Sequence, residues 1–354
     1  MSNIPNDSPA PTRAGEELNL EGLNTWLQHN APGVGSIQTI TQFPGGFSNL
    51  TYCLQTTTGE FILRRPPFGA NIKSAHDMGR EYKVLSLLKP VYTKVPFPIA
   101  YCDKEEVIGA PFYIMERLKG VILRAANAPK LNLAPEILRS TSEALIDNLV
   151  ALHSLDIEAT GLAQLGKPDG YVTRQVEGWI KRYYNAETDR IPAFDEAAIW
   201  LQKNIPVSSS PAFLHNDYKY DNVVLNPNNL SEIIGVLDWE MSTVGDPLMD
   251  LGATLAYWSE PNDAKEIKFF NLTWLPGNLS KKEAAERYGH KSGRKLDNIL
   301  FYYVFGLLKN AVIVQQIYAR WKQGHTQDPR FATLLPVVQA LSKQAIDYIN
   351  RGNL

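Results

Sequence analysis

The eight residues from His215 to Asn222 hold the side chains of this sequence that are best suited to chemistry. Asp217 offers a carboxylate that can take a proton from a hydroxyl group and fix the direction of its attack. Asn222 offers a neutral amide oxygen, and hard oxygen atoms are the ligands that Mg²⁺ prefers. A base and a metal ligand at this spacing indicate phosphoryl transfer, which depends mainly on positioning and on neutralisation of charge.

The order of these residues matches the pattern H-x-D-x-x-x-x-N of the kinase catalytic loop. For any one such residue alone, a turn is the better interpretation, because Asp and Asn form turns in many loops. Two strand signals follow this loop, however, and a turn at 226–229 joins them before the second ends at Asp238. Since a hairpin folds back on itself, we expect Asn222 and Asp238 to face the same divalent ion.

Three further polar residues have no catalytic assignment from their pattern. We interpret His215 as a brace for the loop backbone. Asp221 is either a turn residue or a carboxylate beside the substrate, and both interpretations stay open. His153 lies on an apolar helical face, where a histidine is more often a satisfied core residue than a metal ligand.

The composition is that of an ordinary globular protein, with 354 residues, 44% of them hydrophobic and 20% charged. This length predicts two lobes or domains. A net charge of −2 offers no basic field for nucleic acid or an anionic membrane, so neither is an expected partner. Cys53 and Cys102 lack zinc-site spacing, and we expect two buried free thiols in a reducing cytoplasm.

The termini and the most apolar stretch contain no expected targeting or spanning segment. Residues 1–17 are polar and Pro-rich, which predicts a disordered tail. The stretch Ile299–Leu308 is shorter than the roughly 18 apolar residues of a spanning helix. We therefore expect a buried core helix there, and a cytoplasmic protein.

Alternating apolar residues predict strands in the first third of the chain, and helical periodicity dominates the rest. The expected strands are 36–43, 49–56, 60–65, 100–102, 112–116, 222–225 and 233–237. The expected helices are 18–29, 74–88, one through Leu138 and Leu152, 299–321 and 334–350. This order predicts a small β-rich lobe followed by a larger, mainly helical one.

The segment FLHNDYKYDNVVLNPNNLSEIIGVLDWEMSTVGDPLMDLG resembles the signature of the aminoglycoside phosphotransferase and choline kinase-like superfamily. Six further segments extend the resemblance to the branch with a kinase-like domain fused to acyl-CoA dehydrogenases. They are PGGFSNLTY, FILRRPPFG, SAHDMGREYKVLSLL, PFYIMERLKG, LVALHSLD and GLAQLGKPDGYVTRQVEGW. The resemblance implies an α+β, protein-kinase-like two-lobe fold. A small antiparallel β N-lobe over 18–117 would bind the nucleotide, and a larger, mainly helical C-lobe over 118–354 would hold the catalytic loop and acceptor site.

The resemblance also implies Mg²⁺ as cofactor, ATP or GTP as cosubstrate, and roles for further residues. Asp217 would be the catalytic base, with Asn222 and Asp238 on the metal, while Asp246 and Asp250 would anchor the loop and the following helix. The nucleotide would contact a loop, a strand with its helix partner, and a hinge, which comprise Gly46, Phe47, Ser48, Asn49, Ile62, Arg64, Glu81, Met115, Glu116, Arg117 and Leu118. Strand alternation puts Ile62 and Arg64 on one face, for the base and the phosphates, and Arg65 on the other.

The sequence departs from the family pattern at two positions. Asn216 replaces the usual Gly, and Asn tolerates the left-handed conformation better than most residues. Arg64 replaces Lys, which is not a conservative change, although choline kinase-like members also carry Arg there. Trp-Glu follows Asp238 in place of Phe-Gly, as is usual in this superfamily.

The first hypothesis for function is a small-molecule kinase, because no APE-type activation segment suited to a protein substrate follows Asp238. The acceptor stays open between a hydroxyacyl-CoA or hydroxy acid and an aminoglycoside or choline-type alcohol. Tyr171, Arg174, Gln175 and Trp179 are either an acceptor-side patch or a packed helix face. The alternatives are a nucleotide-binding scaffold without turnover and a metal-dependent hydrolase. The oligomeric state is unknown.

Overall fold

A computed structural model of the chain describes residues 7–43, 49–68, 77–326 and 328–354. The protein divides into two compact units. We call residues 1–122, 224–229 and 233–241 the first unit, and residues 123–223, 230–232 and 242–354 the second unit. The antiparallel sheet and the helical part together make the two-lobe α+β fold predicted from the sequence.

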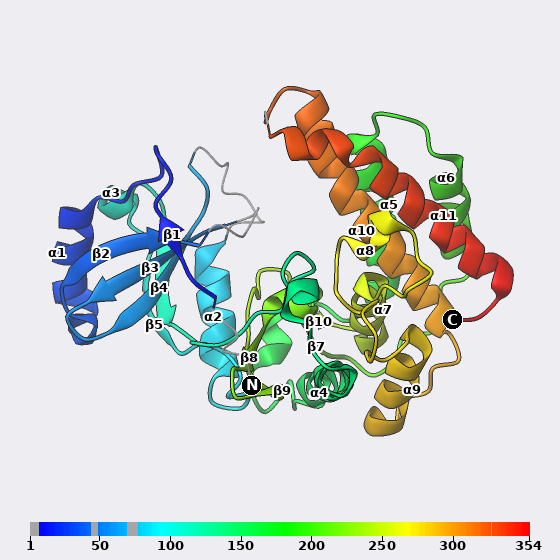
Figure 1. Cartoon of the computed structure of the whole chain (residues 1–354), viewed down its shortest axis with the longest axis horizontal. Coiled ribbons are helices and arrows are strands. Elements are labelled where there is room, and N and C mark those ends of the chain that lie inside the picture. Colours follow the sequence, from blue (N-terminus) through cyan, green and yellow to red (C-terminus); the bar gives the residue numbers. More distant parts are fainter. Residues whose placement is uncertain (1–6, 44–48, 69–76, 327) are drawn as a thin grey trace. The chain divides into compact units, whose positions relative to one another are not determined.

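The first unit is built on a six-stranded antiparallel sheet in the order β1-β2-β3-β4-β6-β5 (Figure 1). Its strands are β1 (Ala10–Pro11), β2 (Ile37–Gln42), β3 (Leu50–Thr56), β4 (Glu60–Arg65), β5 (Pro98–Cys102) and β6 (Phe112–Glu116). The β3–β4 hairpin pairs Leu50 with Arg65 through to Gln55 with Glu60. This register fixes which side chains of β4 share a face, because a slip of one residue would exchange the faces.

Helices cover this sheet and bury its apolar residues. They are α1 (Leu20–Asn30), α2 (Met78–Leu88), α3 (Glu105–Ile108) and the 3₁₀ turn η1 (Pro32–Val34). Leu23 and Leu27 of α1 pack into one core cluster with Leu63, Phe112 and Ile114 from the central strands. Helix α2 contacts β5 and β6, and its N-cap Asp77 accepts the N–H of Arg80. Because β6 pairs with β4, the packing of α2 on β5 and β6 fixes the position of α2 relative to β4.

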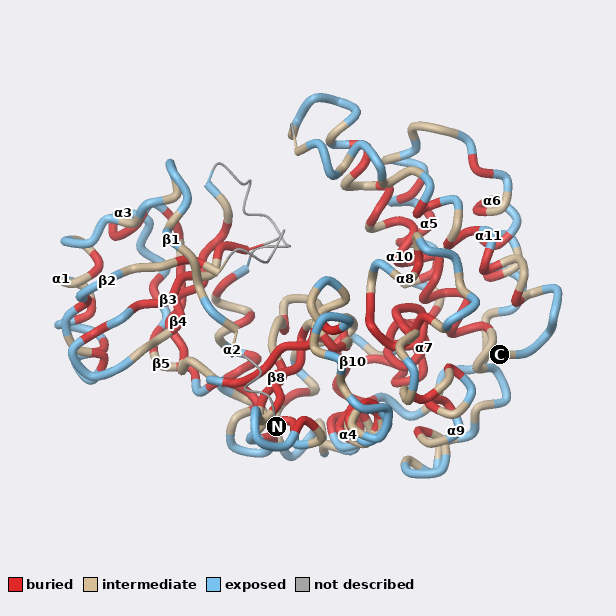
Figure 2. The backbone as a smooth tube through the Cα atoms, viewed as in Figure 1, coloured by how far each residue is buried: buried red, intermediate tan, exposed pale blue. Residues whose placement is uncertain are grey.

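The second unit consists mainly of helices packed on the long α10 (Ile299–Lys322). The others are α4 (Pro135–His153), α5 (Tyr171–Ala186), α6 (Pro192–Lys203), α7 (Pro247–Tyr257), α8 (Lys265–Lys268), α9 (Lys281–Ser292) and α11 (Leu335–Arg351). Short 3₁₀ turns join them, namely η2 (Ala128–Leu131), η3 (Leu162–Leu165), η4 (Tyr220–Asn222) and η5 (Pro329–Thr333). Every residue of α7 is buried, and Figure 2 shows the burial of α7 and of most of α10.

Two short antiparallel pairs flank the loop at 215–222. Strands β7 (Ala212–Leu214) and β10 (Thr243–Gly245) pair with each other, so the loop leaves a small sheet. Strands β8 (Val223–Asn226) and β9 (Asn229–Val236) form the hairpin expected after the loop. This hairpin leads from Asn222 to Asp238, as the sequence predicted.

Helix α10 is long and apolar enough to cross a membrane by length and composition alone. However, 78% of its most apolar window is buried inside the protein, and core helices of soluble proteins pass the same test. The prediction of a buried core helix is confirmed. Cys53 and Cys102 are buried and free, as expected.

Several observed elements were not expected from the sequence, namely β1, α3, α6, β7, β10, α8 and α9. The prediction of disorder over 1–17 is wrong at Ala10–Pro11, because these residues pair with Thr41 and Gln42 at the sheet edge. The polar α9 is defined by its ends, a capping box at Ser280 and a left-handed Gly293.

The backbones of α7 and α10 approach each other closely where the two helices cross. A Cβ atom on Gly252 would lie 2.1 Å from the carbonyl oxygen of Tyr302, and one on Gly306 would lie 2.3 Å from the carbonyl oxygen of Gly252. Neither helix can give way, because both are buried. The two glycines therefore set how closely α7 packs on α10.

We predict that Gly252→Ala lowers the free energy of unfolding by about 3 kcal/mol, because the added methyl group forces the two helices apart. Urea denaturation measures this change. The control is Gly178→Ala in α5, where the nearest atom to an added Cβ is the Arg182 guanidinium at 3.4 Å. That variant should gain up to about 1 kcal/mol from helix propensity. Equal stability of both variants would contradict the prediction.

Candidate active site

Asp217 lies at the centre of a cluster of polar side chains in the second unit. Its Oδ1 accepts hydrogen bonds from the Tyr257 hydroxyl at 2.8 Å and from Lys219 Nζ at 3.0 Å. Its Oδ2 accepts from Lys219 Nζ and from the side-chain amide of Asn222, both at 2.9 Å. The side chain is 16% exposed, so the carboxylate is fixed in direction yet open to a reactant.

The surroundings of Asp217 keep its carboxylate ionised. Burial favours the neutral acid, but the positive charges of Lys219 and Lys309 outweigh it and hold the pKa of Asp217 below its usual value. Burial likewise opposes the charge of Lys219, while the Asp217 carboxylate raises the pKa of that lysine. Lys219 also lies 4.5 Å from the centre of the Tyr257 ring, a cation–π contact. Asp217 is therefore ready to accept a proton at neutral pH.

The backbone that carries Asp217 is fixed by Asp250 of α7. The buried Asp250 carboxylate accepts the backbone N–H groups of His215 at 2.6 Å and Asn216 at 2.8 Å, and its Oδ2 lies 3.1 Å from His153 Nε2. The second nitrogen of His153 contacts the Tyr288 hydroxyl at 2.8 Å. His153 is thus the satisfied core histidine predicted, and Asp250 anchors the loop as expected.

Asn216 adopts the left-handed conformation, with φ of 65°. This confirms that Asn can stand where the family usually has Gly, since Asn tolerates this region better than most residues. Its side-chain oxygen accepts from the Tyr171 hydroxyl at 3.3 Å, which adds a contact that glycine cannot make. The brace predicted at His215 is present, because its Nδ1 accepts the N–H of Asp217 at 3.2 Å.

Asn222 is oriented in a way that suits a metal ligand. Its side-chain nitrogen donates both to the Asp217 carbonyl at 2.8 Å and to the Asp217 carboxylate at 2.9 Å. With the nitrogen committed to these bonds, the amide oxygen points away from Asp217. A neutral oxygen is a suitable ligand for Mg²⁺.

Arg64 is the centre of a second cluster, which lies in the first unit. Its guanidinium lies 3.4 Å from Glu81 of α2, 3.1 Å from Asp238 and 4.0 Å from Glu240. Burial opposes the charge of Arg64, but these carboxylates outweigh it and raise its pKa further. Within the described residues, the buried Nε of Arg64 has no hydrogen-bond partner. The predicted Arg64–Glu81 pair therefore exists, and Arg64 keeps one donor for an anion.

Asp238 belongs to the first unit, and Asp217 and Asn222 belong to the second. Like Asn216, Asp238 is a non-glycine residue with φ of 65°. It comes shortly after β9, which ends at Val236, and its left-handed backbone accompanies the contact of its carboxylate with Arg64. Strained backbone of this kind is common at functional sites. The convergence of Asn222 and Asp238 on one ion stays a prediction.

The face of β4 that carries Arg64 continues onto β6. Ile62 pairs with Met115 and Arg64 with Tyr113, so these four side chains share one face of the sheet. Arg65 lies on the opposite face, where its Nη1 donates to the Ile108 carbonyl at 2.9 Å. The predicted alternation is therefore confirmed, with apolar Ile62 and Met115 beside a cation.

The segment after β6 makes contacts that limit how it can hold a nucleotide base. The N–H of Glu116 donates to the Phe97 carbonyl at 2.9 Å, so a base edge needs other backbone groups of 116–118. The Arg117 side chain pairs with Glu60 at 3.0 Å. Gly46, Phe47 and Ser48 of the expected nucleotide loop lie outside the described residues. Asn49 is buried, and its side chain donates to Glu240 at 2.9 Å.

Comparison with known proteins gives the family. The model of the phosphotransferase enzyme family matches residues 39–284, more than half of the chain. The chain belongs to this family. Acyl-CoA dehydrogenase family member 11 of Rattus norvegicus is 33% identical over 343 residues, which cover 95% of this chain but 44% of that protein. The chain thus spans less than half the length of this curated relative, and the resemblance stated from the sequence is confirmed.

Solved structures agree with this family assignment. A crystal structure from Ralstonia eutropha, provisionally named an aminoglycoside phosphotransferase, is 28% identical, with a TM-score of 0.80 over 95% of this chain and 99% of that one. The GDP and kanamycin complex of APH(2″)-IIIa shares the fold, with a TM-score of 0.60 at 15% identity over 94% of this chain and 99% of that one. These likenesses confirm the protein-kinase-like fold and the phosphotransferase family expected from the sequence.

Four residues of the two clusters were not predicted from the sequence of this phosphotransferase. The pattern assigns no role to Lys219 or Glu240, although they follow Asp217 and Asp238 closely in the sequence. Tyr257 and Lys309 were missed because they lie far from the catalytic loop in the sequence. A lysine in the middle of the apolar stretch of α10 was a usable signal for Lys309. Of the predicted acceptor-side patch, Tyr171 and Trp179 are buried and Arg174 is exposed, which is the pattern of a packed helix face.

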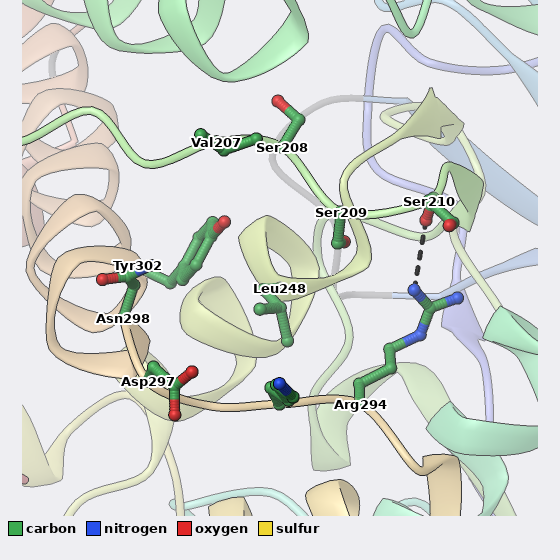
Figure 3. Close-up of a pocket in the computed structure, with 10 residues that line it drawn as sticks. Val207, Ser208, Ser209, Ser210, Leu248, Arg294, Asp297, Asn298 and Tyr302 are labelled. Atoms are coloured by element: carbon green, nitrogen blue, oxygen red, sulfur yellow. Dashed lines mark hydrogen bonds between the residues drawn. The ribbon is translucent and has the colours of Figure 1, made fainter.

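A cavity of about 450 Å³ lies elsewhere in the second unit (Figure 3). It is lined by the loop before β7, the start of α7 and the segment before α10, with Arg294 donating to the Ser210 carbonyl at 3.1 Å. One wall touches the structural carboxylate Asp246, which caps α7 and accepts from Ser209 and Tyr302. None of the predicted site residues lines this cavity.

We predict that Asp250→Asn lowers the free energy of unfolding at pH 7 by roughly 3 kcal/mol, because one amide oxygen cannot replace two charged acceptors in a buried site. Burial works against ionisation of Asp250, but His153 and the backbone N–H groups hold its pKa below the usual value. A lowered pKa in the folded state stabilises the protein at pH values above the unfolded-state pKa of about 3.9. This contribution is lost as the pH falls through the folded-state pKa.

The difference in stability between wild type and Asp250→Asn should therefore narrow only at acid pH. Urea denaturation at pH 7 and at several values below about 4 measures it. Asp328→Asn is the control, since that carboxylate is paired with Arg330 at the surface and should change stability by no more than about 0.5 kcal/mol. A difference in the free energy of unfolding that stays constant across the whole pH range would contradict the assignment of charge to Asp250.

Proposed function

We propose that this phosphotransferase moves the γ-phosphate of ATP or GTP to a hydroxyl group of a small molecule in a Mg²⁺-dependent reaction. The observation that carries the proposal is the Asp217 carboxylate, which is kept ionised and held in one direction by Lys219, Tyr257 and Asn222. The acceptor hydroxyl gives its proton to Asp217 as its oxygen attacks phosphorus. The bond from phosphorus to the bridging oxygen breaks, and the nucleoside diphosphate leaves.

Lys219 and Tyr257 have separate tasks in this proposal. Both donate to Asp217 Oδ1, and Lys219 also reaches Oδ2, so the carboxylate cannot rotate freely. A general base positioned in this way contributes roughly 10²–10⁴-fold to the rate. The ammonium of Lys219 also places positive charge beside the attacking oxygen, where a phosphoryl group gathers negative charge.

The donor set fits a hard divalent cation. Asn222 has an amide oxygen directed away from Asp217, and Asp238 has a carboxylate with 32% of its side chain exposed. These two residues would hold Mg²⁺, which supplies neutralisation of phosphate charge when it is bound. Asp238 contacts Arg64 in the structure, so the same carboxylate links the cation-binding and the phosphate-binding groups.

The nucleotide would lie on the face of β4 and β6 described above. Ile62 and Met115 offer apolar contact to a base, and Arg64 offers its Nε and its charge to the phosphates, with Glu81 holding the guanidinium. GDP in APH(2″)-IIIa supports a purine nucleotide. The backbone of 116–118 and the loop from Gly46 to Asn49 complete this proposed site.

We propose an acceptor with a negative charge, such as a hydroxy acid or a hydroxyacyl-CoA. The relative from Rattus norvegicus is named as an acyl-CoA dehydrogenase, which supports an acyl-chain substrate. Lys219 and Lys309 place two positive charges near Asp217, which disfavours polycations such as aminoglycosides and cations such as choline. A panel of hydroxyacyl-CoAs, hydroxy acids, choline and kanamycin, each with ATP or GTP, tests whether the negatively charged acceptors are phosphorylated in preference to the cationic ones. Phosphorylation of kanamycin or choline alone would contradict this preference.

A scaffold that binds nucleotide without turnover is the alternative. The ordered contacts of Asp217 disfavour it, since a scaffold has no need of an oriented base. Cytoplasmic location, and the lack of nucleic-acid or membrane partners, stay predictions.

We predict that Asp217→Asn lowers turnover of nucleotide and acceptor by roughly 10²–10⁴-fold, because the variant cannot take the proton. Its affinity for Mg·nucleotide should change little. Isothermal titration and a phosphate-release assay measure the two effects separately. Asp328→Asn is the control, because it removes a surface carboxylate that is paired with Arg330. Loss of turnover and affinity together would assign Asp217 to structure.

We predict that Asp238→Asn removes most of the effect of Mg²⁺ on nucleotide affinity, because the charged metal ligand is lost. Titrations of wild type and variant with ATP and GTP, each with and without Mg²⁺, measure this effect. A scaffold need not require metal, so equal affinity of the wild type with and without Mg²⁺ would favour the alternative.

A further inference from the structure

Lys309 is a buried lysine in an apolar helix. It lies in the middle of α10, between Leu308 and Asn310, with 2% of its surface exposed. Moving an ammonium group out of water is costly unless a specific partner compensates for it. Burial accordingly lowers the pKa of Lys309, while the carboxylates of Asp217 and Asp250 favour its charged form. A group retained at such a cost points to a task other than packing.

Lys309 makes one hydrogen bond among the described residues. Its Nζ donates to the backbone carbonyl oxygen of Asn216. The same Nζ lies 5.8 Å from the centre of the Trp179 ring of α5, which provides an aromatic wall. The ammonium is therefore directed at the catalytic loop, one residue before Asp217.

The carbonyl of Asn216 belongs to the peptide group that joins Asn216 to Asp217. On the other side of this peptide group, the N–H of Asp217 donates to His215 Nδ1 at 3.2 Å. Asp250 holds the preceding N–H groups but neither atom of this peptide group. Rotation of a peptide plane next to a left-handed residue needs only local changes of two backbone angles. Lys309 and His215 thus hold the two ends of the plane that directs Asp217.

We propose that Lys309 is a positioning residue, which fixes the peptide group before Asp217 and so aims the carboxylate at the acceptor. The proposal rests on the proposed function only in taking Asp217 as the base. It separates the roles of the two lysines: Lys219 contacts the carboxylate itself, and Lys309 acts through the backbone.

Lys309→Met tests the proposal, because methionine keeps the length and apolar stem of the side chain but removes the donor. The change also leaves the Asn216 carbonyl without this donor, and removing one partner of a buried polar pair is destabilising. We expect a lowered melting temperature in a protein that still folds at 25 °C, and a fall in kcat of about 10–100-fold with the nucleotide Kd unchanged. Hydrolysis of Mg·ATP and Mg·GTP is the assay, with water as the acceptor. Lys309→Arg, which keeps a donor, should recover part of the lost kcat.

Gln315→Met is the matched control. Gln315 is buried in the same helix, and its side chain donates to Ala186 and Thr188, far along the chain from the loop. This change should affect stability but not kcat. A fall in kcat of the same size in Gln315→Met, or a Lys309→Met protein that does not fold, would overturn the proposal, since either result assigns Lys309 to packing.

A second measurement does not depend on turnover. Amide hydrogen exchange of the Asp217 N–H, followed by NMR without nucleotide, reports whether the peptide group is held. Lys309→Met should speed this exchange at least tenfold relative to wild type and Gln315→Met. Unchanged exchange would overturn the proposal. If the wild type hydrolyses no nucleotide and transfers no phosphate, the proposed function fails, and the exchange measurement still decides the role of Lys309.

Discussion

The candidate site depends on one constraint: a partly buried carboxylate must stay ionised and keep one direction. Burial alone would favour the neutral form of Asp217, and two lysine charges reverse this preference. The hydrogen bonds from Lys219, Tyr257 and Asn222 then fix the carboxylate relative to the loop. Each of these donors comes from a part of the chain that the rest of the second unit must hold in place.

The fold meets this constraint through α7 and α10, which cross with glycine against glycine. Helix α7 brings Asp250 to the loop backbone and Tyr257 to the carboxylate, and α10 brings Lys309 to the Asn216 carbonyl. The closeness of the two helices therefore matters for chemistry as well as for stability. In the first unit, the sheet and α2 do the same for Arg64, since β4 carries the guanidinium and α2 carries Glu81.

Much of this could be predicted from the sequence, because its signals are local. The catalytic-loop pattern, the hairpin after it and the alternation along β4 all depend on neighbours a few residues apart. The Arg64–Glu81 pair followed only from the family resemblance. Tyr257 could not be predicted, because it reaches the loop through tertiary packing across 40 residues of sequence. The apolar stretch around Lys309 marks this lysine as unusual, but it does not reveal a partner 93 residues away. Strand β1 was missed because two residues carry no periodicity, and α9 because a polar helix lacks an apolar face that repeats clearly.

The central proposal is that Asn222 and Asp238 hold one divalent ion during phosphoryl transfer. A crystal structure with Mg²⁺ and a non-hydrolysable ATP or GTP analogue tests it most directly. We expect the amide oxygen of Asn222 and a carboxylate oxygen of Asp238 within about 2.0–2.2 Å of the cation, which also binds phosphate oxygens. A cation bound to the phosphates with either side chain turned away from it would contradict the proposal.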